Sequence, residues 1–237
     1  MIDVFLALAG PALAAASPAK VAAKAHPLRA ARKAPAANRP RQAARDVLPE
    51  AIRSDDTTRV ADWIAASHDN GALPYIIIDK KAASLFLFDA KGEPIGSAPV
   101  LIGVAPGDDA TPGVGSKNLA EIGPAEKTTP AGRFLAKYGL AAGKQRVLWV
   151  DYATSVALHP IPPGASRKER RPQRMLSPTP DDNRITFGCI NVPKVFYGRS
   201  VRPLFQKKGG YVYILPDTKP IEVVFPRLRV QALANGS

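Results

Sequence analysis

PYIIIDKKAASLFLFDAKGEPIGSAPVLIG, residues 74–103, alternates short runs of β-branched and aromatic residues with polar turns. The turns fall at Asp79-Lys80-Lys81 and at Asp89-Ala90-Lys91-Gly92. Val, Ile, Phe and Tyr favour strands, and the Asp and Gly residues between the runs favour tight connections. The segment therefore predicts a β-hairpin or meander, and with it a β-rich fold.

Three later stretches share this composition and extend the prediction along the chain. They are RVLWVDYATSVALHP, RITFGCINV and YVYILP. Helical spacing is confined to TTRVADWIAASHDN (57–70) and to VFYGRSVRPLFQKK (195–208), where one Gly and one Pro weaken it. The segment IEVVFPRLRV (221–230) is expected to form a final strand or an extended arm. We predict one mostly β domain, residues 73–216, with short flanking helices.

The composition allows a globular domain and limits its chemistry. With 237 residues the chain can bury a substantial core, and no apolar run is long enough to span a bilayer. The formal net charge of +13 favours anionic partners such as nucleic acid, acidic lipid or a carboxylate-rich polymer. A single cysteine excludes an internal disulfide, and with only three histidines a Cys/His zinc site is not expected.

The first residues resemble an export signal followed by a basic linker. Residues 1–16, MIDVFLALAGPALAAA, contain an apolar stretch and then small residues of the A-x-A type. We therefore expect export to the periplasm or cell wall, although an Ala-rich tail fits the same residues. Residues 17–47 are almost entirely Ala, Pro, Lys and Arg, which predicts a disordered linker. The linker is expected to lie on the anionic cell-wall or membrane surface, or to act as a spacer. Residues 48–72 are predicted as a short helical lead-in and 217–237 as a C-terminal extension.

The only cysteine lies in RITFGCINVP, residues 184–193, directly after a glycine. A cysteine in this position can be a core residue, a metal ligand or a nucleophile. A nucleophilic thiol needs a base and donors for the oxyanion. His159 is the only histidine inside the predicted β domain, and the N–H groups of Gly188 and Cys189 are natural oxyanion donors. The pairing of Cys189 with His159 therefore favours a catalytic site, against the alternative that each residue is structural.

Three segments, in chain order, resemble the catalytic domain of the L,D-transpeptidases. They are TTPAGRF (128–134), VALHP (156–160) and TFGCINV (186–192), and the resemblance covers roughly residues 74–216. It implies a β-sandwich-like domain with a cleft that holds the cysteine and the histidine. It also implies that the substrates are peptidoglycan stem peptides.

The resemblance further implies a reaction and its catalytic groups. The Cys189 thiolate attacks the carbonyl that joins the third residue of the stem, a diamino acid, to D-Ala. D-Ala leaves, and an amine of another stem accepts the acyl group. His159 takes the thiol proton and later protonates the leaving amine. The main-chain carbonyl of Pro160 is a candidate to orient the imidazole, and the reaction needs no metal or organic cofactor.

Other residues of the motifs have weaker assignments. Thr186 is expected to orient the neighbouring backbone or the substrate, and Asn191 to fix the cysteine loop or contact the substrate. Arg184 is a candidate carboxylate binder without a motif match. The chain departs from the family at Phe187, where many members have His, and at Pro160, where Gly or Ser is common. The long Pro-rich loop between residues 160 and 184 is basic, and it is expected either to cover the site and bind carboxylates or to be solvated.

Other functions fit parts of the same sequence. On this scaffold water can replace the amine, giving an L,D-carboxypeptidase or endopeptidase. A non-catalytic cell-wall-binding protein is a second alternative, which the Phe187 substitution favours. Nucleic-acid binding is not expected, because the basic residues lie in the linker and one loop without interleaved aromatic residues. A papain-like or NlpC/P60-like thiol peptidase is excluded, because in those enzymes the cysteine precedes the histidine in the chain and here the histidine comes first.

Overall fold

The computed structural model describes residues 51–141 and 145–229, and the structural statements below concern these residues. The predicted export segment 1–16 and linker 17–47 lie outside them, as does the end of the predicted C-terminal extension. In the described part of the chain, no helix has the length and apolar character needed to cross a membrane.

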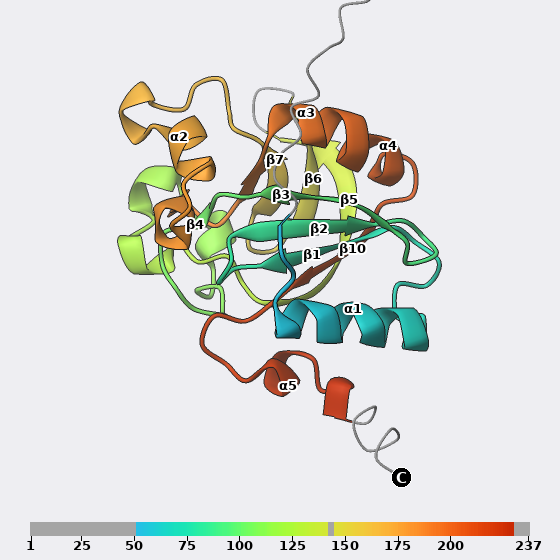
Figure 1. Cartoon of the computed structure of the whole chain (residues 1–237). Coiled ribbons are helices and arrows are strands. Elements are labelled where there is room, and N and C mark those ends of the chain that lie inside the picture. Colours follow the sequence, from blue (N-terminus) through green and yellow to red (C-terminus); the bar gives the residue numbers. More distant parts are fainter. Residues whose placement is uncertain (1–50, 142–144, 230–237) are drawn as a thin grey trace, which may run out of the picture. The chain divides into compact units, whose positions relative to one another are not determined.

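Eight strands form one mixed sheet in the order β3-β2-β1-β10-β5-β6-β7-β9 (Figure 1). Neighbours are antiparallel except for the parallel pairs β1–β10 and β7–β9. A short parallel pair, β4–β8, stands apart from this sheet. The strand bounds are β1 Tyr75–Asp79, β2 Ser84–Phe88, β3 Pro94–Pro99, β4 Ile102–Gly103, β5 Gly132–Leu140, β6 Arg146–Asp151, β7 Val156–Pro160, β8 Arg184–Thr186, β9 Ile190–Val192 and β10 Gly210–Ile214.

The sheet turns on itself at β5, which belongs to both halves. Residues 132–136 of β5 pair with β10, and residues 137–140 pair with β6. The main core lies between the halves. It combines alternate residues of one half, such as Ile76 and Ile78, with alternate residues of the other, such as Leu158 and Ile190. The predicted mostly β, sandwich-like fold is therefore confirmed, and the alternation that predicted the strands is the one that fills the core.

A second apolar cluster covers the outer face of β1, β2 and β10. The other alternate residues of these strands, Tyr75 and Ile77 among them, pack against α1, Asp55–Ser67 (Figure 1). The helix begins after Ser54, whose hydroxyl accepts a hydrogen bond from the Thr57 N–H. It buries Trp63 together with Val60 and Ile64, the spacing from which a helix was predicted.

The end of the described chain differs from the prediction. We expected residues 221–230 to form a strand or an extended arm, and this is wrong, because Ile221–Val224 form the short helix α5. Ile221, Phe225 and Leu228 join the cluster around α1. Their spacing of four and three residues suits a helix, and burying these side chains outweighs the strand preference of the Val residues between them.

The remaining helices are short. One helical segment after β9 contains α3 Lys194–Phe196, a π-helical turn Tyr197–Val201 and α4 Arg202–Phe205, and its buried side chains Tyr197, Val201 and Phe205 close one end of the main core. The 3₁₀ turns between β4 and β5 are Val114–Ser116, Leu119–Glu121 and Pro124–Glu126. The long basic loop folds into Arg167–Glu169, α2 Arg171–Met175 and Pro180–Asn183.

Candidate active site

The pairing of β7 with β9 brings the predicted histidine and cysteine segments together. Leu158 pairs with Ile190 and His159 pairs with Asn191. Leu158 and Ile190 point into the core, so the next residues along each strand point to the opposite face. Cys189 precedes Ile190 and shares that face. Strand spacing and rise place the Cα atoms of residues 159 and 189 about 8 Å apart, a separation that an imidazole and a thiol side chain can span.

The His159 ring is oriented by its own strand. Nδ1 lies 2.7 Å from the main-chain oxygen of Pro160, the carbonyl singled out from the sequence. A carbonyl only accepts, so Nδ1 carries the proton and the lone pair is on Nε2. Burial lowers the pKa of His159, and the Arg171 guanidinium lowers it further, while the bond to Pro160 acts in the opposite direction. The ring is therefore neutral at pH 7, with Nε2 available as a base.

The Cys189 thiol is half-buried and protonated at rest. Its sulfur lies 3.6 Å from the Ser155 carbonyl oxygen, to which the S–H donates. Burial raises the pKa of Cys189 above its usual range, and the Ala157 backbone and Arg171 offset this only in part. A neutral thiol must give up its proton to a base when the sulfur attacks, whereas a preformed thiolate–imidazolium pair has already transferred it.

This resting state predicts the pH dependence of thiol alkylation. Iodoacetamide reacts with the thiolate, and Cys189 is the only cysteine. Because its pKa is raised, the alkylation rate should climb through the whole range from about pH 6 to pH 9 without a plateau. The measurement is the rate of mass increase of the intact protein as a function of pH.

An ion pair would give the opposite profile. A thiolate held by a protonated His159 would level off well below pH 8, and that plateau would disappear in His159→Ala. A plateau that is present in the wild-type protein and absent from this variant would therefore overturn the neutral resting state. Unfolded protein supplies the reference curve for a solvated thiol.

The cysteine loop is held by the two motif threonines. Thr186 is buried, and its hydroxyl donates to the Cys189 carbonyl at 2.6 Å while accepting from the Gly188 N–H at 3.2 Å. Thr129 donates to the Gly188 carbonyl at 2.8 Å and accepts from the Gly103 N–H at 2.9 Å. Thr186 thus orients the neighbouring backbone. Thr129, to which the sequence analysis gave no role, joins the TTPAGRF segment to the cysteine loop.

Gly188 also contacts the protein itself. Its N–H, which is predicted to stabilise an oxyanion, donates to the Thr186 hydroxyl. The Cys189 N–H is the remaining donor of the predicted pair. Gly188 has φ +124°, and a Cβ here would lie 2.8 Å from the Thr128 carbonyl oxygen. Backbone conformation and close packing therefore require glycine at this position.

Arg171 is the functional candidate that the sequence did not single out from the basic loop. Its Nη1 donates to Asn191 Oδ1 at 2.9 Å and its Nε to Glu169 Oε2 at 2.8 Å. The Arg171 charge acts on both His159 and Cys189. One residue of α2 therefore fixes Asn191, the strand partner of His159, and adds positive potential at the thiol.

Two further predicted residues have defined surroundings. Asn191 is buried, and its Nδ2 has no hydrogen-bond partner within the described residues. Arg184 donates to Asp217 Oδ1 at 2.7 Å, so its guanidinium neutralises a carboxylate of the protein itself. In residues 51–141 and 145–229, no group of three or more His, Cys, Asp or Glu side chains is placed to hold a metal ion.

Phe187, the departure from the family pattern, is partly exposed beside the cysteine. The ammonium group of Lys127 lies 3.9 Å from the centre of its ring, a cation–π contact. Lys127 immediately precedes the TTPAGRF segment, so this contact joins the same two loops as the Thr129 hydrogen bond. At this position the phenyl ring contributes packing, and the polar contacts of a histidine are missing.

Comparison with known proteins gives likenesses at the level of fold. No protein-family model matches the sequence, and no curated protein matches it. Among solved structures, the L,D-transpeptidase of Xylanimonas cellulosilytica is 14% identical with a TM-score of 0.36, over 60% of this chain and 60% of that chain. The catalytic domain of the E. faecium L,D-transpeptidase is 15% identical with a TM-score of 0.33, over 60% of this chain and 95% of that domain. The helical cell shape determining protein Pgp2 of Campylobacter jejuni is 9% identical with a TM-score of 0.41, over 76% of this chain and 64% of that chain.

Proposed function

We propose that this protein is a cysteine acyltransferase of the L,D-transpeptidase kind that acts on peptidoglycan stem peptides in cell-wall remodelling. The observation that carries the proposal is the convergence of the three motif segments. The cysteine loop is bonded to Thr129 of the first segment, and its following strand pairs with the histidine strand of the second. Arbitrary matches to three separated motifs have no reason to meet, whereas these three are joined by a hydrogen bond and a strand pairing.

The groups present support each proton transfer of the reaction. With Nδ1–H directed at the Pro160 carbonyl, Nε2 of His159 takes the thiol proton as Cys189 attacks the carbonyl of the third stem residue. The carbon–nitrogen bond to D-Ala then breaks, and Nε2–H protonates the departing amine. A thioester remains. An acceptor amine attacks it, Nε2 takes a proton from that amine, and the thiol is regenerated when the sulfur leaves with the proton.

Two neighbours of the pair support the proposal in different ways. Arg171 stabilises negative charge on Cys189, since its guanidinium lowers the thiol pKa against the effect of burial. Asn191 Nδ2 has no hydrogen-bond partner among the described residues, and this supports the proposed substrate contact of Asn191, because a buried amide donor without a partner is costly. Arg184 has no such support, since Asp217 occupies its guanidinium.

Product analysis tests the reaction. The protein is incubated with a disaccharide-tetrapeptide, and its products are separated and weighed by mass spectrometry. Release of D-Ala together with a cross-linked dimer is the expected result. Release of D-Ala with free tripeptide would contradict the transferase and identify the L,D-carboxypeptidase alternative.

The matched control is Cys189→Ser, which changes only the nucleophilic atom and should release no D-Ala. A carbapenem, as an acylating β-lactam, should add its mass to the wild-type protein and not to this variant. A protein that neither releases D-Ala nor becomes acylated, although folded, would be the non-catalytic cell-wall-binding protein. The substrate also places the protein in the periplasm or cell wall, where the basic linker 17–47 would meet an anionic surface.

A further inference from the structure

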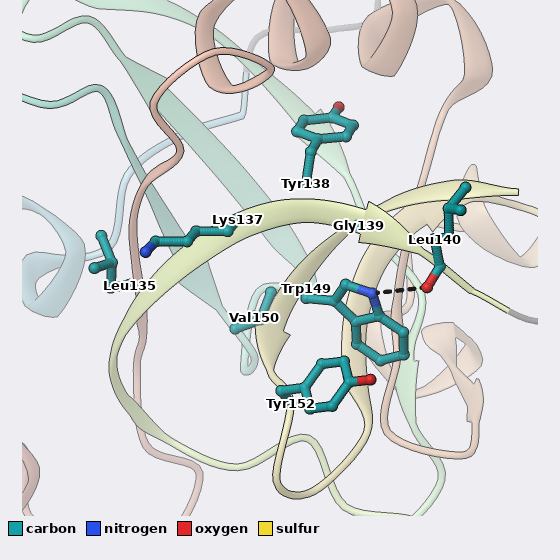
Figure 2. A pocket seen from close by; sticks show the side chains of 8 residues that line it. All are labelled: Leu135, Lys137, Tyr138, Gly139, Leu140, Trp149, Val150 and Tyr152. Atoms are coloured by element: carbon teal, nitrogen blue, oxygen red, sulfur yellow. Dashed lines mark hydrogen bonds between the residues drawn. The ribbon is translucent and has the colours of Figure 1, made fainter.

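A pocket of about 430 Å³ opens on β5 and β6. Figure 2 shows the pocket from close by, with the Trp149 and Tyr152 rings side by side and Tyr138 pointing away from them. The residues that line it are Leu135, Lys137, Tyr138, Gly139, Leu140, Trp149, Val150 and Tyr152. Neither His159 nor Cys189 is among them, so the pocket is separate from the candidate catalytic pair. Its volume lies in the range of small-molecule sites.

The indole of Trp149 is in contact with Gly139, Leu140 and Tyr152. Its ring lies against the backbone of Gly139, where a Cβ would come within 2.7 Å of Trp149 Cδ1. Nε1 donates to the Leu140 carbonyl at 3.4 Å, the dashed line of Figure 2. The ring of Tyr152 stands against it at a centroid distance of 5.0 Å and an angle of 66°. Tyr152 is 77% exposed, so an ordered aromatic corner faces solvent.

Strand register connects this corner to the thiol. Lys137 pairs with Trp149, and Trp149 pairs with Ala157. Since Leu158 pairs with Ile190, Ala157 is level with Cys189. All of these residues alternate with core residues and share the face that carries His159. Trp149 and Cys189 are two strand spacings apart, or about 10 Å.

We propose that the Trp149–Tyr152 pocket binds the N-acetylated sugar to which the donor stem peptide is attached. This inference rests on the proposed function. There, the third stem residue reacts at Cys189, and the first is joined to the sugar. Three extended residues span about 10 Å, which matches the two strand spacings between the backbones of Cys189 and Trp149. A stem peptide that crosses the strands from Cys189 past Ala157 therefore brings its sugar to Trp149.

The side chains of the pocket are better suited to bind a pyranose ring than to form an interface with another protein. A sugar has one apolar face of C–H groups and a rim of hydroxyl and acetamido groups, and it is neutral. The flat indole and the upright Tyr152 ring match the apolar face, while the Tyr152 hydroxyl and the Lys137 ammonium supply polar partners for the rim. The pocket is lined by eight residues, far fewer than the roughly 20–30 residues that each partner contributes to a stable protein interface.

Binding is tested without turnover by tryptophan fluorescence. The chain has two tryptophans, and Trp63 is buried with 4% exposure. In Cys189→Ser, acrylamide quenching therefore reports mainly on Trp149. The probe is the disaccharide of two N-acetylglucosamine units, which is neutral like the peptide-linked sugar and has no free lactyl carboxylate. It should protect the fluorescence from acrylamide, and Tyr152→Ala should lose the protection, whereas Leu119→Ala, another exposed apolar side chain, should retain it.

Kinetics supply the second arm. For Trp149→Ala, the ratio of kcat/KM on disaccharide-tetrapeptide to kcat/KM on free tetrapeptide should fall about tenfold, as expected for loss of an aromatic contact. The sugar site is overturned if this ratio is unchanged or if the disaccharide gives no protection. It is also overturned if the quenching depends on protein concentration, as it would if a second copy of the protein occupied the pocket. Failure of the proposed function would give a different result. Neither substrate would then be turned over, whereas the acrylamide quenching experiment would still show whether the disaccharide binds.

Discussion

His159→Ala should slow acylation of Cys189 by about 10²–10⁴-fold, the usual contribution of a positioned general base. Burial keeps the thiol protonated, so the reaction depends on a group that removes the proton during attack. The imidazole has its Nδ1 bonded to the Pro160 carbonyl and presents Nε2 for this purpose. The measurement is the rate of mass increase with a carbapenem, followed by D-Ala release from a tetrapeptide stem.

The design of this experiment separates chemistry from folding. His68 is exposed at the end of α1, and His68→Ala is the matched variant in which acylation should continue. In urea unfolding, the free energy of unfolding of His159→Ala should lie within about 1 kcal/mol of the wild-type value, since the imidazole is only half-buried and makes one hydrogen bond, to the Pro160 carbonyl. Added imidazole should restore part of the lost rate. Acylation of folded His159→Ala at the wild-type rate would remove His159 from the mechanism.

Much of the fold could be predicted from local pattern. Alternation at Ile76 and Ile78 follows from a strand with two different faces, and the helical spacing of Trp63 with its neighbours follows from burial on one side. The same rule failed at α5, because three apolar residues at helical spacing are interleaved with Val residues that favour strands. Only the cluster against which Ile221 packs decides between the two patterns.

The site could be predicted in its chemistry and only partly in its contacts. Cys189 and His159 were predicted as nucleophile and base because they are the only cysteine of the chain and the only histidine of the predicted β domain. The Pro160 carbonyl was predicted from the resemblance, and it does contact the His159 ring. Thr129 and Arg171 could not be ranked above other threonines and arginines, since their partners are distant in sequence. Their roles depend on where the loops return to the sheet.

A buried ionic network around Lys80 also could not be predicted from the sequence, and it contacts the cysteine loop through Thr129. Lys80, predicted as part of a turn, has a fully buried side chain. Its ammonium donates to the Gly107 and Thr129 carbonyls at 2.6 and 2.9 Å and to Asp108 at 3.0 Å, and it lies 3.4 Å from Asp217. Through Thr129 the network reaches the Gly188 carbonyl. Nothing in the local sequence distinguishes Lys80 from the exposed Lys81.

Lys80→Met should destabilise the protein by about 3–5 kcal/mol, because it leaves buried carboxylates without their cation. Burial alone would raise the pKa of Asp108, but backbone hydrogen bonds from Lys219, Asp217 and Thr218 outweigh it and hold the pKa well below its usual range. A depressed pKa means that the stabilisation is complete at pH 7 and is lost as the pH falls through that low value. Urea unfolding at pH 7 therefore measures the loss of Lys80 against an ionised Asp108.

Lys81→Met is the control, since the same change at the adjacent exposed position should alter stability by no more than about 0.5 kcal/mol. Asp108→Asn should also destabilise, and the double variant should lose less than the sum of the single losses, because the second change removes a charge that the first left unpaired. Additive losses would mean that Lys80 and Asp108 stabilise the protein independently of each other. Lys80 would then contribute to stability through its other contacts, such as those with the Gly107 and Thr129 carbonyls. Loss of carbapenem acylation in Lys80→Met at a urea concentration where the protein is still folded would further show that the network positions the cysteine loop through Thr129.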